Sequence, residues 1–495
     1  MHKLLVMAHI SQIQNNEAIS RRQLFELTAK LSLPAILAQL SGILMQYIDA
    51  AMVGRLGATP SAAIGLVSTS QWLFWGVCSA MTVGFTVQVA HKIGAKDYES
   101  ARSILRQSFV GMLIFSTFIA IVGMAISYKL PHWLGGSDDI CHMASLYFFI
   151  FVAALPGLTI SFLCGGMLRC AGNMKIPSIL SLLMAVLDVC FNFFLIFPKR
   201  TIEIGDFMFT VPGADLGIAG AALGTVAAEI LTAILMLYFL VVKEPGVALK
   251  GTKGSFKLQS NVIKKALKIS APMTLAHAVI CGAQIVVTII VAPLGVAAIA
   301  ANAFAVTAES LCYMPGYGIS DAATTLVGQS YGANRKQLAR HFGYVAVGLG
   351  MIVMTAMGIL MWVGADFMMT MMSPVEAISS LGAEILRIEA WAEPMFAAAI
   401  VSYGVFIGAG DTLIPACMNF SSIWLVRVPL AAFLAPKIGL KGVWIAMCIE
   451  LIFRGSIFII RLFGKSWLSD KNKKKKEEIT EAYEDNLNGS GQDLD

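Results

Sequence analysis

Charged side chains are scarce in this chain. Only 13% of its 495 residues are Asp, Glu, Lys or Arg, against about 25% in a soluble globular domain. Hydrophobic residues make up 57% of the sequence, and the mean hydropathy is +0.75. A soluble protein could not cover that much apolar surface with polar atoms. The composition excludes a disordered chain, argues against an ordinary cytosolic enzyme, and indicates a protein of the lipid bilayer.

Three kinds of motif are also missing. The nine Cys residues lie mostly in apolar runs, and none forms a CxxC pair. We interpret them as small buried hydrophobes and not as a disulfide framework or a zinc site. No basic patch is interleaved with aromatic residues, so we expect no nucleic-acid partner. No small-residue cleavage site closely follows the short apolar start, and we expect no cleaved signal peptide.

Long apolar runs dominate what is present. A membrane helix needs about 20 apolar residues, and twelve such runs occur without the alternation of a membrane β-barrel. The sequence therefore predicts an all-α integral membrane protein with twelve transmembrane helices. The polar residues 199–212 alternate enough to predict a short external hairpin. The runs are residues 31–54, 64–90, 104–128, 144–168, 177–198, 216–242, 265–292, 297–328, 341–364, 381–408, 415–436 and 441–463.

The positions of Lys and Arg predict the orientation. In the loops, the termini and the adjoining ends of the runs, 27 of them lie on the side of the two termini and 6 on the opposite side. Cytoplasmic loops carry the excess of Lys and Arg. We therefore expect a multi-pass protein of the cell inner membrane with both termini in the cytoplasm.

The two halves of the chain match at a constant offset of 238 residues. Pro34 matches Pro272, Gly94-Ala95 matches Gly332-Ala333, and Ala171-Gly172 matches Ala409-Gly410, all without a gap. Six helices per repeat give the copies the same orientation, which predicts two lobes around a central cleft and a transporter that works by alternating access. The predicted parts are a cytoplasmic N-terminal segment (1–30), an N-lobe (31–242), a cytoplasmic inter-lobe loop (243–264), a C-lobe (265–464) and a disordered charged tail (465–495).

Acidic residues that break the repeat are the first candidates for function, because a carboxylate inside a membrane is costly and tends to be paired, protonated or functional. Asp49 in the first run corresponds to Val287, and Asp188 in the fifth run corresponds to Val426. Asn192 follows Asp188 by four residues, so the two share a helical face.

Together these residues predict a polar pocket in the N-lobe. Pro34 removes a backbone donor and is expected to bend the first helix. Burial would favour a protonated carboxyl group, whereas a charged pair with Asn192 would suit Na⁺. Two structural alternatives stay open: Asp49 could face the outer loop near Arg55, and Asp188 could be a satisfied structural acid.

Other polar residues inside the runs are weaker candidates. Four residues are candidates for lining a substrate cleft: Gln46, Glu309, Glu389 and Glu393. Glu309 could equally hydrogen-bond a neighbouring helix. For Glu389 and Glu393, which are four residues apart, a structural polar cluster is the first interpretation and cleft lining the second. Arg427 has no sequence-local partner. No nucleophile–base pair or cluster of metal ligands appears in the runs, so an integral-membrane enzyme is a poor alternative.

Several stretches, in this order and spacing, resemble the multidrug and toxic compound extrusion (MATE) family. They are residues 49–57, 94–102, 168–177 and 217–222, and the likeness extends over about residues 25–465. The resemblance implies an antiporter that exports organic cations and drug-like compounds in exchange for H⁺ or Na⁺. It implies no cofactor beyond this coupling ion, and we expect a monomer.

Within the family the chain resembles the prokaryotic DinF-like branch. That likeness assigns the coupling cation to Asp49, Asp188, Asn192 and Thr225, with Na⁺ possible at the first three. The branch often has Asn four residues before Asp, whereas here Asp188 precedes Asn192. The seventh run lacks the acid of the NorM-like branch, which argues against a second cation site in the C-lobe.

Two other transport functions stay open. A flippase for a lipid-linked precursor has a related architecture, but it would need several Arg or Lys residues along the cleft, and the N-lobe runs carry none. An ion channel would need a filter-like repeat, which neither half shows.

Overall fold

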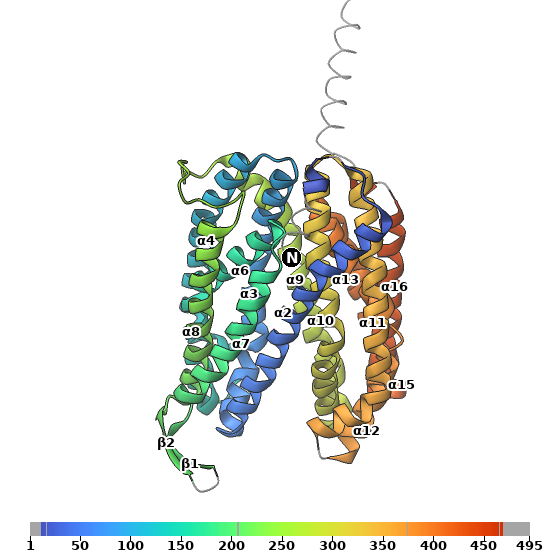
Figure 1. Ribbon diagram of the computed structural model, residues 1–495. Helices are drawn as coiled ribbons and strands as arrows, with labels where there is room; N and C mark the ends of the chain where they lie inside the picture. Colours follow the sequence, from blue (N-terminus) through green and yellow to red (C-terminus); the bar gives the residue numbers. More distant parts are fainter. Residues whose placement is uncertain (1–10, 16, 205–206, 374, 465, 469–495) are drawn as a thin grey trace, which may run out of the picture.

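The computed structural model describes residues 11–15, 17–204, 207–373, 375–464 and 466–468. Within them, eleven helices are long and apolar enough to cross a bilayer, and a bent helix pair supplies a twelfth span. All twelve predicted runs therefore fall on helices, and the predicted all-α membrane fold is confirmed. Figure 1 shows two bundles that lie close together at one end and separate towards the other.

The first bundle holds α2 to α8, and the second holds α9 to α16. The helices of the first are α2 (Arg21–Gly54), α3 (Ala58–Gly94), α4 (Tyr98–Ser127), the short α5 (Leu130–Trp133), α6 (Asp138–Cys170), α7 (Lys175–Leu195) and α8 (Gly217–Tyr238). Those of the second are α9 (Ser260–Val291), α10 (Val296–Gly332), α11 (Lys336–Met372), α12 (Glu376–Glu389), α13 (Glu393–Ala409), α14 (Leu413–Ser422), α15 (Val428–Ile438) and α16 (Leu440–Phe463).

The tenth predicted run is not one straight helix. It divides into α12 and α13, which meet at an angle of 61°. Pro394 lies in the first turn of α13, where its missing N–H costs nothing but where it prevents α12 from continuing. The following run contains a π-helical turn, Ile423–Arg427, between α14 and α15.

A two-stranded hairpin joins α7 to α8. Strand β1 (Pro198–Ile204) pairs antiparallel with β2 (Phe207–Ala214), which confirms the predicted hairpin. It lies at the end of the molecule where the bundles separate (Figure 1). We call this end the hairpin side, and the end where α2 begins and α16 ends the terminus side.

Helix α2 contacts both bundles. It begins ten residues before the predicted run, because Ser20 and Gln23 form a capping box in which each side chain bonds the other's backbone N–H. Leu24, Leu27 and Leu31 are buried in a core shared with α10, α11, α13 and α16. Further along, α2 packs on α7 of the first bundle. It thus crosses from one bundle to the other (Figure 1).

The two bundles meet closely on the terminus side, where α3 crosses α10. A Cβ atom added to Gly94 would lie 2.0 Å from the Gln329 carbonyl oxygen, and one added to Gly332 would lie 2.0 Å from the His91 carbonyl oxygen. Only glycine permits this approach. The predicted disordered tail, apart from residues 466–468, lies outside the described residues.

Candidate functional site

Two glycines bring α7 and α8 together. A Cβ atom on Gly220 would lie 2.4 Å from the Leu195 carbonyl oxygen, and one on Gly224 would lie 2.0 Å from Asn192 Oδ1. Spacing of small residues by four lets membrane helices pack backbone to backbone. Gly224 therefore makes the space in which the Asn192 side chain lies.

The Asn192 amide joins the two acids that break the repeat. Its Nδ2 donates to Asp49 Oδ1 at 2.9 Å and to Asp188 Oδ2 at 3.1 Å. Asp188 and Asn192 have 0% exposed surface, whereas Asp49 is half-buried. The structure thus brings together the three residues that the sequence places in a polar pocket, on the two helices α2 and α7.

Thr225 of α8 completes the predicted group. Its hydroxyl donates to the Ala221 carbonyl oxygen at 3.2 Å and lies beside the Asp188 carboxylate. Tyr147 of α6, which the sequence analysis did not single out, lies near Asp49 and contacts Gln71. No local pattern distinguishes this Tyr from others in apolar runs.

Two oxygens in this group lack a partner. Asp188 Oδ1 and Asn192 Oδ1 are buried and accept no hydrogen bond from the described residues. Buried polar atoms without partners are rare, since each costs the free energy of its lost hydration. Carboxylate and amide oxygens are also the ligands that hard cations prefer. The group can therefore hold a proton shared between carboxylates, or a small cation bound by oxygens.

The remaining predicted residues of the N-lobe lie on α2. Pro34 is inside this helix, which continues through it, and Gln46 is exposed one turn before Asp49.

The three acids considered as cleft residues are buried in the C-lobe. Glu309 is 6% exposed, and Glu389 and Glu393 are 0% exposed. The burial of Glu389 and Glu393 in this conformation favours the structural polar cluster, the first interpretation of this pair, over the cleft-lining alternative. The physical reason is the break before Pro394, which places these residues on two separate short helices facing the bundle interior.

Cations of the same lobe surround these acids. Arg454 Nε lies 3.1 Å from Glu450 Oε1, which also accepts from Ser422 Oγ at 2.6 Å. No partner of Arg427 could be identified from the local sequence. In the structure its acidic neighbours are Glu450, Glu389 and Glu309. All four oxygens of Glu389 and Glu393 lack a hydrogen-bond donor in the described residues. In that part of the chain, no three acidic, His or Cys side chains converge as metal ligands.

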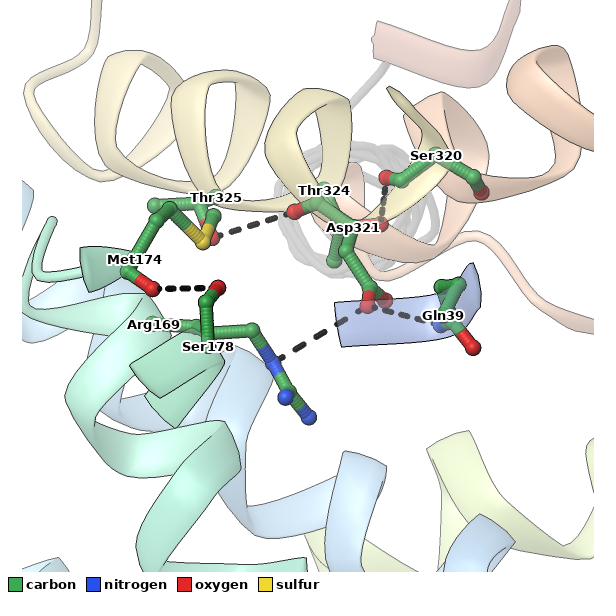
Figure 2. Close-up of polar contacts among 8 residues, drawn as sticks. All are labelled: Gln39, Arg169, Met174, Ser178, Ser320, Asp321, Thr324 and Thr325. Atoms are coloured by element: carbon green, nitrogen blue, oxygen red, sulfur yellow. Dashed lines mark hydrogen bonds and ion pairs between the residues drawn. The ribbon is translucent and has the colours of Figure 1, made fainter. Parts of the chain in front are cut away.

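A further polar contact joins the two bundles, and the sequence analysis missed it. Asp321 of α10 lies 4.0 Å from Arg169 Nε of α6, and its Oδ2 accepts from Gln39 Nε2 of α2 at 3.4 Å (Figure 2). A sequence signal existed, because Asp321 corresponds to Val83 in the first repeat. It therefore breaks the symmetry as Asp49 and Asp188 do.

Curated proteins of similar sequence are named as multidrug transporters. The probable multidrug resistance protein NorM of Thermotoga maritima is 26% identical over 443 residues, which cover 88% of this chain and 92% of that protein. The NorM protein of Pseudomonas aeruginosa is 26% identical over 439 residues, which cover 86% of this chain and 87% of the relative. The DinF-like branch stays a prediction, since these relatives carry the NorM name.

Solved structures share the fold at lower identity. A mutant of the Vibrio cholerae MATE transporter VcmN superposes with a TM-score of 0.80 at 18% identity, covering 89% of this chain and 97% of that one. A MOP-superfamily transporter from Pyrococcus furiosus gives 0.80 at 18% identity, covering 91% and 96%. The family model MatE matches residues 34–194 and 272–433, one match in each repeat. The chain therefore belongs to the MatE family of multidrug transporters.

Proposed function

We propose that the protein is a secondary active antiporter, which exports organic cations and drug-like compounds in exchange for H⁺ or Na⁺. The observation that carries this proposal is the Asn192 amide that bridges Asp49 and Asp188 beside two buried oxygens without partners. We infer that this group, with Thr225, binds the coupling cation.

The position of Asp49 supplies a route from cation binding to lobe movement. Asp49 lies near the hairpin-side end of α2, and the other end of this helix packs in the core of the second bundle. Protonation or Na⁺ binding neutralises part of the Asp49–Asp188 pair and changes how α2 packs on α7. A ligand shifts a conformational equilibrium by its difference in affinity for the two states. Cation binding would thereby favour one lobe arrangement and drug binding the other.

The direction of transport follows from the predicted orientation. With the termini in the cytoplasm, the hairpin side faces outward, and the bundles separate on that side (Figure 1). The coupling cation would then enter from outside and drive release of the drug there. We propose that a single chain in the inner membrane performs this cycle.

The flippase alternative receives no support from the cations of the C-lobe. Arg427 and Arg454 lie among buried glutamates, and Arg387 forms an ion pair with Asp366. Arg387 and Arg454 are thus already paired with carboxylates, and Arg427 has three acidic neighbours, so these cations do not form a free basic site for the pyrophosphate of a lipid-linked precursor.

Drug efflux from proteoliposomes tests the proposal. We expect ethidium transport to be driven by an inward gradient of either H⁺ or Na⁺, with the two gradients imposed separately. Asp49→Asn should fold normally yet lose this gradient-driven transport. Asp366→Asn is the matched control, since its side chain is 68% exposed and belongs to a surface ion pair. Wild-type transport that ignores both gradients, or an Asp49→Asn variant as active as the wild type, would contradict the proposal.

A further inference from the structure

Asp321 is loosely held between three helices. Its two partners, Arg169 at 4.0 Å and Gln39 at 3.4 Å, are both at the long end of the range for such contacts. The Asp321 side chain is 37% exposed although it lies within the membrane helix α10, three turns before its terminus-side end. Figure 2 shows the Arg169 and Gln39 side chains reaching the Asp321 carboxylate from different helices. The long contacts and the partial exposure leave this carboxylate room for a further ligand.

The Arg169 guanidinium also lies over an aromatic ring, which in turn packs on a second one. Its Cζ is 5.8 Å from the centre of the Phe162 ring, and Phe162 makes an edge-to-face contact with Trp75 of α3 at 5.4 Å. A cation within about 6 Å of an aromatic ring is attracted by the ring quadrupole. Arg169 is thus a planar, delocalised cation between a carboxylate and an aromatic ring.

These contacts are the ones that recognise an organic cation. A charged amine or aromatic cation binds where a carboxylate offsets its charge and an aromatic face covers its apolar part. Tyr317 lies one helical turn before Asp321 on the same face, and it is 44% exposed.

We propose that Asp321, Phe162 and Trp75 form a subsite for monovalent organic cations, and that Arg169 occupies it as a built-in competitor in this conformation. The proposal deepens the proposed function and rests on it, because it assumes that organic cations are exported. A substrate that takes over Asp321 releases Arg169. Since α6 belongs to the first bundle and α10 to the second, this release removes an ion pair that joins the bundles. Binding of the substrate and loosening of the lobe contact are thereby one event.

Two substitutions separate this role from a structural one. Asp321→Asn removes the carboxylate, and we expect the affinity for ethidium to fall by about tenfold, the loss of one charged contact. Arg169→Gln removes the competitor, and we expect the ethidium affinity to rise. An ion pair that serves only to hold the lobes together would change the affinity in the same direction in both variants, because either substitution breaks it.

The measurement is fluorescence titration of the purified full-length protein with ethidium and with the neutral dye N-phenyl-1-naphthylamine. Opposite shifts for ethidium in the two variants, with neutral-dye binding unchanged, support the subsite. Equal shifts, or equal effects on both dyes, overturn it. The two proposals can fail separately. If Asp321→Asn leaves ethidium binding unchanged, the subsite proposal is overturned. The antiport proposal still stands in that case, provided that the wild-type protein transports ethidium and Asp49→Asn abolishes this transport. A wild-type protein that neither binds nor transports ethidium would overturn the substrate class itself.

Discussion

His91 and Gln329 are equivalent residues of the two repeats, and each bonds the opposite lobe in the same way. His91 Nε2 donates to the Gly408 carbonyl oxygen at 2.7 Å, and Gln329 Nε2 donates to the Cys170 carbonyl oxygen at 2.7 Å. Gly408 and Cys170 are themselves equivalent, because both pairs are separated by 238 residues. The bundles are therefore joined on the terminus side by a pseudo-symmetric pair of hydrogen bonds, next to the close crossing of Gly94 and Gly332.

Removing one of these hydrogen bonds should open the terminus side more often. In Gln329→Leu, the Cys170 carbonyl oxygen loses its hydrogen-bond donor from the other lobe. A hydrogen bond contributes about 1 kcal/mol, which corresponds to roughly a fivefold rise in the ratio of molecules open on the terminus side to closed molecules. We expect maleimide to label Cys170, which is 5% exposed, several times faster than in the wild type. Peptide mass spectrometry measures the rate at each Cys.

Cys164 on the same helix is the internal control. It is 0% exposed and lies within the first bundle, so its labelling should stay slow when the lobes separate. Acceleration of both Cys residues would indicate general loosening of the fold, and an unchanged rate at Cys170 would show that the hydrogen bond does not hold the lobes together.

Gly224→Ala should disturb the cation site through Asn192. The added methyl group would overlap Asn192 Oδ1 at 2.0 Å and approach the Asn192 backbone nitrogen at 3.1 Å. Overpacking of this kind costs about 1–3 kcal/mol. We expect a lower melting temperature and weaker gradient-driven efflux, because the amide moves away from the two carboxylates.

Gly348→Ala of α11 is the matched substitution, since nothing lies within 4 Å of its added Cβ atom. Alanine favours a helix over glycine, so this variant should match or exceed the wild type in stability and in transport. Equal behaviour of the two alanine variants would show that Gly224 does not position Asn192.

Arg427→Met should strongly destabilise the second bundle. Arg427 lies beside Glu450, Glu389 and Glu309, in a cluster that also holds Arg454. Removing one partner of a buried ionic cluster costs about 3–5 kcal/mol. Arg387→Met changes a surface pair whose partner Asp366 is 68% exposed, and such pairs contribute about 0–1 kcal/mol. Thermal unfolding in detergent compares the two, and a loss for Arg387→Met as large as that for Arg427→Met would contradict the assigned role of the cluster.

Local patterns were sufficient to predict much of the fold and part of the site. Helix length follows from apolar runs of bilayer thickness, which is why the twelve spans were predicted. The shared face of Asp188 and Asn192 follows from their spacing of four residues. The meeting of Asp188 with Asp49 was predicted because both acids break the repeat, a criterion that works without knowledge of helix packing.

Features that depend on tertiary contacts could not be read from those patterns. The orientation of Glu389 and Glu393 depends on the 61° bend between α12 and α13, and apolar content does not reveal a bend. The first third of α2 packs on the second bundle because of shape matching between distant helices. Arg169 lies just outside the predicted run 144–168, at the end of α6, and local sequence does not reveal that its side chain reaches Asp321 on the other bundle.

The central claim is that the Asp49–Asp188 pair binds the coupling cation and that this cation opposes drug binding. Ethidium affinity of the purified protein, measured over a series of pH values and Na⁺ concentrations, tests it most directly. We predict that the wild-type affinity falls as one of these cations becomes more concentrated. Asp49→Asn and Asp188→Asn, which carry a neutral side chain of the same shape, should show no such dependence. Variants that retain the wild-type dependence would contradict the claim.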